Sequence, residues 1–491
     1  MLKSIIFLIL LVKYFAVADN FIWSKTFGTE LSDGARDIVI TDDNNFLMIG
    51  YSYNPNDLKT DLSLIKTDED GNQLWLKKHE IDGWIFGNSV VNDISNEGFT
   101  ISGRIIDRSL GSSFNLFIAH FDHEGNYDWL YQFGGEKNDF AEKIIKTSDN
   151  NYLVTGTTES FGQGEGDLWL LKFDTYGDTL WTKTFGSPSS DLGYCTTEFN
   201  GFYYSTGSTA KFDTPGNSSG NNKEVAVFKT DLNGNLVSEN AYWVMGSGQI
   251  DYDTGYSICS LSDGNLCISG STSKEGVDPM DIGVIKIDTD LNLIWKRNKE
   301  IGSFYDYGYT VCEATEDGIL VAGSYNHPLN CTTDGYVLKY DLEGNEVYNV
   351  TLGGEGSDSF RSIKHITDNQ FIITGFTNSF GNGAYDFWLV KYEDNPVKIY
   401  ENLPNTNKLK QNYPNPFNPE TNLRFELERT EMVRLSVFND SGSEIDIIYS
   451  GIATKGSHTF TWLNKDISSG VYFCCLKSES NVEFKKMILM K

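Results

Sequence analysis

The chain has 491 residues, of which 39% are hydrophobic and 14% aromatic, so its composition excludes disorder as the default state. One ordinary core does not extend over this length, and we expect either several domains or a repeat architecture. The net charge of −29 is carried by residues 19–400, which hold 57 acidic and 26 basic side chains. This balance excludes nucleic acid as a partner, because phosphate binding needs clustered lysine and arginine.

The N-terminus has the layout of a secretory signal peptide. Lys3 precedes an apolar run from Ile5 to Val12, and the small residues Ala16-Val17-Ala18 stand before Asp19. The run is well short of the ~20 apolar residues needed to span a bilayer, which disfavours a membrane anchor. We expect residues 1–18 to be a signal peptide that is removed on export, with no stable membrane span in the rest of the chain.

Regularly spaced aromatic residues indicate an internal repeat. Successive spacings of 52, 54, 52, 62, 52 and 53 residues separate Trp23, Trp75, Trp129, Trp181, Trp243, Trp295 and Tyr348. The one long interval contains a polar loop insertion at 215–222, and the period continues after it. Within each period, short β-type segments alternate with Gly, Asn and Asp turn residues, which predicts four strands per repeat.

Seven four-stranded repeats are typical of a β-propeller, in which twisted sheets stack around a channel. Residues 21–26 have the pattern of a last strand, whereas the seventh repeat ends near Tyr392 without one. We therefore expect the N-terminal strand to complete the final blade and close the ring, which removes an exposed sheet edge. The repeat pattern resembles that of seven-bladed propellers in many secreted bacterial proteins. This resemblance implies an all-β propeller over 19–395 and no particular activity.

A second domain is predicted after a boundary at 393–396. A polar linker over 396–410 leads to the segment Gln411–Pro419, whose prolines exclude an interior strand. Six alternating segments follow, and they predict a small β-sandwich that completes a domain over 411–491.

This C-terminal segment closely resembles the type A C-terminal sorting domain of type IX secretion. The resemblance rests on Gln411, Asn412, Tyr413, Pro414, Asn415, Pro416, Phe417, Asn418, Pro419, Gly442, Trp462, Gly470, Tyr472 and Lys486. It implies that the signal peptide takes the chain to the periplasm and that the folded tail engages the secretion machinery for passage across the outer membrane. The implied location is outside the cell or on its outer surface, and the cargo function is expected in the propeller.

Aspartates recur at the start of two strands in most repeats and make a candidate ligand face. Asp33 and Asp139 precede first strands, and Asp167 and Asp386 precede third strands. With the usual propeller strand order, both sets lie on one face, together with glycine-rich loops that carry the aromatic residues Phe161 and Phe380. The alternative is that each aspartate caps the backbone turn at the start of its own strand.

No catalytic motif is recognisable in the propeller. It contains no Gly-x-Ser-x-Gly elbow, Walker loop or zincin helix, and its histidines do not occupy equivalent repeat positions. The segment 68–72 resembles a calcium loop but lacks the glutamate and flanking helices of an EF-hand. No cofactor is therefore expected, and calcium stays the alternative.

The regularity of the repeats favours a non-enzymatic function, because an active site usually breaks repeat symmetry and only the loop 211–222 clearly does so. We expect a binding or adhesion module for a polysaccharide or a surface protein. A secreted polymer-degrading hydrolase or lyase and a structural surface protein are the alternatives. Paired carboxylates for glycoside hydrolysis stay open, because the sequence does not give the distances between them.

Overall fold

The computed structural model describes residues 20–490 except for 57, 81–82, 108–112, 211–222, 245–251, 275–276, 303–304, 315–317, 327–331, 368, 395–407, 428–430, 440–443, 464–466 and 479–481. The expected signal peptide, the insertion at 211–222, most of the linker and Gly442 lie outside the described residues. The chain divides into two compact units, one within residues 1–395 and the other within 396–491.

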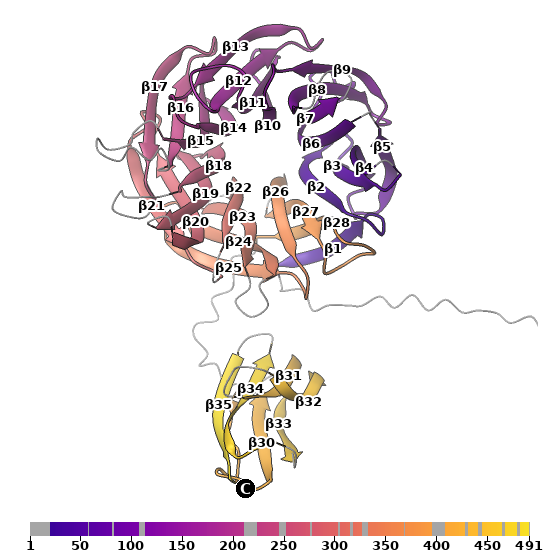
Figure 1. Ribbon diagram of the computed structural model, residues 1–491, viewed down its shortest axis with the longest axis vertical. Helices are drawn as coiled ribbons and strands as arrows, with labels where there is room; N and C mark the ends of the chain where they lie inside the picture. Colours follow the sequence, from indigo (N-terminus) through magenta and orange to yellow (C-terminus); the bar gives the residue numbers. More distant parts are fainter. Residues whose placement is uncertain are drawn as a thin grey trace, which may run out of the picture. The chain divides into compact units, whose positions relative to one another are not determined.

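The first unit is a seven-bladed β-propeller, as the repeat pattern predicts, and each blade is a four-stranded antiparallel sheet around a central channel (Figure 1). From the channel outward the blades are β2 (Asp33–Ile40), β3 (Phe46–Asn54), β4 (Lys59–Thr67), β5 (Gln73–His79); β6 (Gly83–Asn92), β7 (Gly98–Asp107), β8 (Asn115–Asp122), β9 (Tyr127–Phe133); β10 (Asp139–Lys146), β11 (Tyr152–Thr158), β12 (Asp167–Phe173), β13 (Thr179–Phe185); β14 (Leu192–Phe199), β15 (Phe202–Thr209), β16 (Glu224–Thr230), β17 (Leu236–Tyr242); β18 (Thr254–Ser260), β19 (Leu266–Lys274), β20 (Val277–Ile287), β21 (Leu293–Lys299); β22 (Tyr307–Ala314), β23 (Gly318–Asn326), β24 (Thr333–Asp341), β25 (Glu346–Leu352); and β26 (Asp358–Thr367), β27 (Gln370–Thr377), β28 (Asp386–Glu393), β1 (Phe21–Phe27).

The final blade takes its outer strand from the beginning of the chain. Strand β1 pairs antiparallel with β28, and the indole of Trp388 donates a hydrogen bond of 2.8 Å to Ser24 Oγ. This pairing joins residues more than 360 positions apart and leaves β28 without a free edge.

The regularly spaced tryptophans hold neighbouring blades together. Trp23 on β1 packs against Gly71, which sits in the β4–β5 turn of the first blade with φ +76°. A Cβ at Gly71 would lie 2.8 Å from the Trp23 ring, so glycine is needed for the backbone conformation and for the close approach. Trp75 and Gly125 repeat the arrangement one blade further on. The recurring tryptophan and the recurring turn glycine are therefore two halves of one contact between blades.

The hydrophobic core lies between the blades. One cluster joins Leu47 and Leu64 of the first blade to Phe99 and Phe117 of the second, all with 1% exposure or less. Because both faces of each sheet are covered, strands β11 and β12 are buried along their whole length. The sheets are thus rigid supports for side chains that point into the channel.

The second unit is a small β-sandwich, as the alternating segments predict. One sheet has the order β29-β30-β33 and the other β32-β31-β34-β35. The strands are β29 (Lys408–Leu409), β30 (Glu420–Leu427), β31 (Glu431–Phe438), β32 (Glu444–Ala453), β33 (Gly456–Leu463), β34 (Gly470–Ser478) and β35 (Val482–Leu489). Their inward side chains, among them Phe425, Leu435, Trp462 and Met487, form one core.

Candidate ligand-binding site in the propeller channel

Every innermost strand carries a β-bulge close to its beginning, and the additional residues line the channel. The bulge residues of successive blades are Arg36, Asn88, Glu142, Tyr194, Tyr256, Tyr309 and Arg361. In β22 the irregularity also takes in Gly308. A bulge redirects the side chain of its additional residue, and here all seven side chains line a single, partly open cavity of about 300 Å³.

Three arginines form one side of this cavity. Arg36 and Arg361 are bulge residues of adjacent blades, and Arg104 reaches the cavity from β7. The Nε–H group of each arginine is buried without a hydrogen-bond partner. Within the described parts of the chain, none of the three guanidinium groups lies within 4.0 Å of a carboxylate. The cavity therefore has donor groups whose hydrogen bonds are not made inside the protein.

Aromatic rings contact the guanidinium groups of Arg104 and Arg361. The guanidinium carbon of Arg104 lies 4.9 Å from the Phe86 ring centre and 5.3 Å from that of Phe114. Arg361 lies 3.8 Å from the Tyr309 ring centre and 5.1 Å from that of Phe376. A guanidinium held over a ring face keeps its N–H groups at its edge, where they remain free to bind a planar anion.

The site is electrostatically positive. Burial lowers the pKa of Arg104 and of Arg361, and the charge of the nearby Arg36 lowers both further. Burial also raises the pKa of the Glu142 carboxyl above its usual range, although all three arginines act in the opposite direction. The cavity lining holds three arginines and Lys143 against two carboxylates, Asp37 and Glu142.

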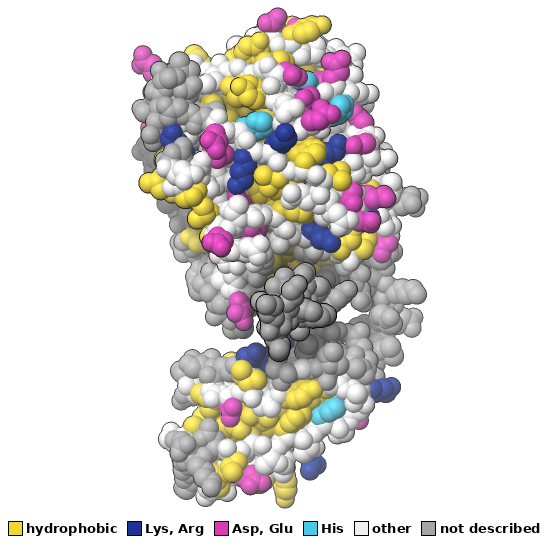
Figure 2. Space-filling model, turned by 90° about the vertical axis from the view of Figure 1, so that its right-hand side faces the viewer, with side chains coloured by type: hydrophobic (Ala, Val, Ile, Leu, Met, Phe, Trp, Pro, Cys, Tyr) yellow, Lys and Arg dark blue, Asp and Glu magenta, His cyan; other side chains and the backbone are white. Residues whose placement is uncertain are grey.

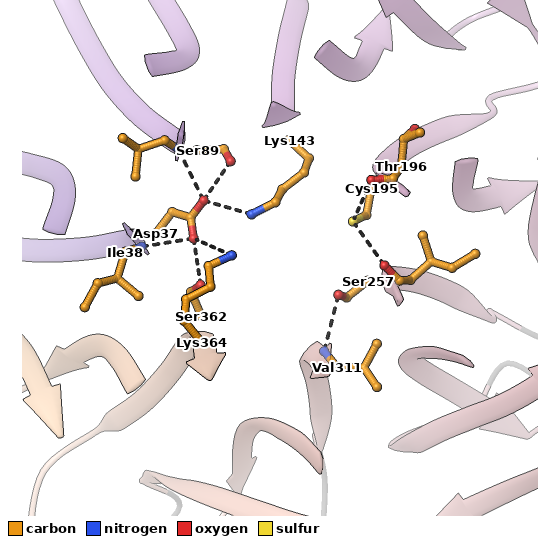
Figure 3. A network of polar contacts seen from close by, with 12 residues as sticks. Asp37, Ile38, Ser89, Lys143, Cys195, Thr196, Ser257, Val311, Ser362 and Lys364 are labelled. Carbon is orange, nitrogen blue, oxygen red and sulfur yellow. Dashed lines mark hydrogen bonds and ion pairs between the residues drawn. The ribbon is translucent and has the colours of Figure 1, made fainter. Parts of the chain in front are cut away.

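The second carboxylate, Asp37, is fully engaged beside this cavity (Figure 3). One of its oxygens lies 2.8 Å from Lys143 Nζ and accepts a hydrogen bond from Ser89 Oγ, and the other accepts one from Ser362 Oγ. Lys364 Nζ lies 3.8 Å away. Burial by itself raises the pKa of Asp37, but the two lysines and these hydrogen bonds hold it well below its usual range. These contacts of Asp37 connect the first blade to the second, third and seventh blades.

Tyrosines from the fourth, fifth and sixth blades form another side of the cavity. Tyr194 and Tyr256 meet edge to face with ring centres 5.0 Å apart, and Tyr256 lies 5.5 Å from Tyr309. Burial raises the pKa of Tyr256 to about 12 and raises that of Tyr194 strongly, so both hydroxyls stay neutral at physiological pH. This side presents aromatic surface and uncharged hydrogen-bonding groups.

The channel contrasts with the outer surface of the propeller. Acidic side chains are spread over the surface seen in Figure 2, in keeping with the acidic excess of residues 19–400. An anionic ligand thus meets an unfavourable field outside and a favourable one in the channel.

The four aspartates expected at a ligand face are buried, with exposed fractions of 2% or less. Asp139 accepts hydrogen bonds from Gly135 N, Thr158 Oγ1 and Ser160 Oγ, and Asp33 accepts from Thr29 N. Asp167 and Asp386 accept from the backbone N–H groups of their own glycine-rich loops. These hydrogen bonds hold the loops in place, which favours the turn-capping alternative over an acidic ligand face. Asp33 Oδ1 and Asp386 Oδ1 are nevertheless buried without a hydrogen-bond partner.

The two loop aromatics differ from each other. Phe161 is 47% exposed and its ring centre lies 5.7 Å from that of Trp169. Phe380 is less exposed than Phe161: it is half-buried, and its ring centre lies 5.9 Å from that of Trp388. They belong to separate blades and neither lines the channel cavity.

Among the residues that the structure describes, no three His, Cys, Asp or Glu side chains come together as a metal site. The same residues include no helix long and apolar enough to cross a membrane.

The signature residues of the second unit hold its last strand. Gln411 Nε2 and Asn415 Nδ2 donate to Lys486 O, and Ile488 N donates to Asn415 Oδ1 at 2.9 Å. Phe417 is buried and packs against Trp462, whose indole donates to Asp446 Oδ2. Two further signature residues make hydrogen bonds within the unit: Asn412 donates to Pro414 O and Thr421 Oγ1, and the Tyr472 hydroxyl donates to Ser468 O while its ring packs on Trp462. Tyr413 is 76% exposed, Pro416 and Asn418 are also exposed, and Pro419 is half-buried. Gly470 begins β34.

The channel residues are absent from the sequence-based site. Six of the seven bulge residues stand three positions after a first-strand aspartate, as in Asp33 and Arg36, Asp191 and Tyr194, or Asp358 and Arg361. Aligning the repeats on these aspartates shows a position that changes from blade to blade. Repeat symmetry is thus broken in the channel as well as in the loop 211–222.

Comparisons with known proteins identify the second unit. Residues 411–490 match the family model of the secretion system C-terminal sorting domain. No curated protein matches the chain. A protein of unknown function from Dyadobacter fermentans is similar in structure with 11% identity and a TM-score of 0.43, over 76% of this chain and 98% of that one. The β-propeller domain of the Trilobed protease from Pyrococcus furiosus is similar with 9% identity and a TM-score of 0.41, over 77% and 99%.

A puromycin hydrolase is also similar, with 9% identity and a TM-score of 0.44, and the match covers 82% of this chain and 60% of the hydrolase. These likenesses concern the fold alone. The family match and the sandwich fold together establish that residues 411–490 are a type IX secretion system C-terminal sorting domain and that the chain is a β-propeller protein exported to the outer cell surface or beyond it.

Proposed function

We propose that this protein is an exported, non-enzymatic binding protein that holds an anionic ligand in the channel of its propeller. The observation that carries the proposal is the set of three arginines, Arg36, Arg104 and Arg361, whose buried Nε–H groups have no partner around one cavity.

Unsatisfied buried donors favour a bound acceptor. Leaving such a group without a partner costs about 1–3 kcal/mol, and a ligand carboxylate or phosphate removes this cost by accepting charge-assisted hydrogen bonds. The aromatic rings that contact Arg104 and Arg361 hold the guanidinium groups in position before the ligand arrives. Less conformational freedom is then lost on binding.

A hydrolase is the second candidate, and one observation favours it. The cavity holds two carboxylates with oppositely shifted pKa values, raised at Glu142 and lowered at Asp37, which is a feature of acid–base pairs. However, the Asp37 oxygens already accept from Ile38 N, Ser89 Oγ, Val90 N, Lys143 and Ser362 Oγ. A carboxylate so fully engaged is a poor nucleophile or base, which favours binding over catalysis.

The test is calorimetric titration of the full-length protein at low ionic strength with acetate, inorganic phosphate and D-glucuronate. We expect saturable binding of at least one anion and a loss of tenfold or more in affinity in both Arg36→Gln and Arg361→Gln. Arg297→Gln on the outer strand β21 removes the same charge away from the channel and is expected to bind as the unaltered protein does.

Absence of anion binding, or equal binding in the two channel variants, contradicts the proposal. Incubation with a glucuronate-containing oligosaccharide separates the second candidate, because release of new reducing ends that is lost in Glu142→Gln identifies a hydrolase.

A further inference from the structure

We infer that the anion bound in the channel is the carboxylate of an acidic sugar residue of the uronic acid type. This inference rests on the proposed function and adds a ligand class to it. Its basis is the two-sided lining of the cavity, with arginines on one side and tyrosines on the other.

The two sides follow from the order of the blades. Arg361, Arg36 and Arg104 come from the seventh, first and second blades, whereas Tyr194 and Tyr256 come from the fourth and fifth. The strands that carry the arginines, β26, β2 and β7, lie on one side of the ring, and the strands that carry the two tyrosines, β14 and β18, lie across from them (Figure 1). A ligand that satisfies both must carry a negative charge at one end and an uncharged polar body at the other.

The arginine side fits a carboxylate. A guanidinium presents parallel N–H groups that match the two oxygens of a planar carboxylate. Glu142 also lines the cavity, and it repels a dianion more strongly than a monoanion. A singly charged carboxylate therefore fits this lining better than a phosphate monoester does.

The tyrosine side fits a sugar ring. Tyr194 and Tyr256 offer aromatic surface next to neutral hydroxyls, which suits a body with C–H faces and hydroxyl edges. Ser257 and Thr310 also line the cavity and add uncharged donors and acceptors. Lys143, the remaining cation of the described lining, is already paired with Asp37 at 2.8 Å, so a second acidic group on the ligand gains little there.

The size of the cavity fits one residue of a polymer. Its volume of about 300 Å³ is at the lower end of the range for small-molecule sites, and it is partly open. One sugar can occupy it while the rest of a chain extends outward. Export to the cell exterior also places the site where acidic polysaccharides are found.

The experiment compares D-glucuronate and D-galacturonate with their neutral partners D-glucose and D-galactose, and with acetate and phosphate, by calorimetry on the full-length protein. We expect a uronate to bind at least tenfold more tightly than acetate and phosphate, and the neutral sugars to show no measurable binding. Tyr256→Leu is expected to weaken uronate binding at least fivefold and to leave acetate binding unchanged. Tyr131→Leu on the outer strand β9 is the matched control.

Acetate or phosphate binding as tight as uronate binding, with no effect of Tyr256→Leu, overturns the sugar assignment and leaves the proposed anion site standing. Equal binding of glucose and glucuronate overturns both the uronic acid assignment and the proposed anion site. Tyr256→Phe and Tyr194→Phe keep the rings and serve if the leucine variant does not fold. A uronate affinity unchanged in both phenylalanine variants then overturns the role of the hydroxyls.

Discussion

The guanidinium carbon of Arg361 lies 3.8 Å from the centre of the Tyr309 ring, across the junction between the seventh and sixth blades. Both are bulge residues of innermost strands, so equivalent positions of two repeats meet in the channel. Here the arginine side of the cavity joins the tyrosine side. The contact fixes the orientation of Arg361 and links the part of the site that binds charge to the part that binds an uncharged group.

Removing the charge of Glu142 should strengthen anion binding. In the unaltered protein this carboxylate interacts with all three arginines and repels an incoming anion. Glu142→Gln keeps the shape of the side chain, and we expect D-glucuronate to bind several-fold more tightly. Glu136→Gln, at an exposed position outside the cavity lining, is the control for a general change in net charge. Equal or weaker binding in Glu142→Gln than in the unaltered protein contradicts this role of Glu142.

The same carboxyl should make anion binding depend on pH. Because burial raises the Glu142 pKa above its usual range, protonation of Glu142 begins at a higher pH than for an ordinary glutamate. Affinity for a uronate is therefore expected to rise as the pH falls from 7 towards 5, since the ligand carboxylate stays ionised until about pH 4. Titrations across this range should show the rise in the unaltered protein and a flat profile in Glu142→Gln. A rise that persists in Glu142→Gln assigns the effect to another group.

Asp37 should be essential for stability. Asp37→Asn leaves Lys143 and Lys364 in the channel without their carboxylate, and breaking such a pair from one side costs about 3–5 kcal/mol. We expect a lowered midpoint in urea unfolding followed by tryptophan fluorescence. Asp42→Asn, at an exposed position a few residues away, should leave the midpoint unchanged. A midpoint in Asp37→Asn equal to that of the unaltered protein contradicts a stabilising role of the Asp37 contacts.

The contribution of Asp37 to the free energy of unfolding should also disappear at acidic pH. Its pKa is depressed in the folded protein, so its stabilisation is complete above the unfolded value of about 3.9 and is lost as the pH falls below it. The difference in unfolding free energy between the unaltered protein and Asp37→Asn should therefore shrink as the pH falls from 4 towards 2. A constant difference over this range rules out ionisation of Asp37 as the source.

The buried aspartate at the start of a first strand should affect stability but not binding. Asp139→Ala removes the acceptor for Gly135 N and Ser160 Oγ, which costs about 1–3 kcal/mol for the groups left without a partner. Thermal unfolding should shift downward while titration with D-glucuronate is unchanged. Asp178→Ala, in an exposed turn of the same blade, is the control. Loss of binding in folded Asp139→Ala restores this aspartate as a ligand contact.

The sorting unit should depend on Asn415 more than on Asn418. Asn415→Ala removes hydrogen bonds to Lys486 O and from Ile488 N, which attach the opening segment to β35. We expect a loss of about 1–2 kcal/mol in unfolding of this unit. Asn418 is exposed in the same segment, so Asn418→Ala should unfold like the unaltered protein. Hydrogen exchange resolved to β35 distinguishes this unit from the propeller, and equal protection in both variants contradicts the attachment.

The seven blades and the C-terminal sandwich could be predicted from the sequence because repetition amplifies weak local signals. Trp75 and Gly125 are 50 residues apart, yet their counterparts recur in several blades at spacings of 48 to 53 residues. The recurrence of the aspartates was equally visible. The sequence left two roles open for them, a ligand face or turn capping, and the folded loops favour capping because Asp139 accepts a hydrogen bond from Gly135 N and is fully buried.

The channel site could not be predicted because its residues are unlike one another. Arg36, Glu142 and Tyr194 share a repeat position but no chemistry, so a search for recurring residues passes over them. Arg104 lies on a second strand and reaches the cavity only through the packing of its blade. The β-bulges that turn these side chains into the channel leave no recognisable composition in a single repeat.

The most direct test of the channel site is a crystal structure of the full-length protein with D-glucuronate. The arginine side predicts the ligand carboxylate at about 2.7–2.9 Å from N–H groups of at least two of Arg36, Arg104 and Arg361, with the sugar ring facing Tyr194 and Tyr256. A ligand bound instead at the exposed loop of Phe161, with the channel occupied by solvent alone, contradicts the assignment of the site.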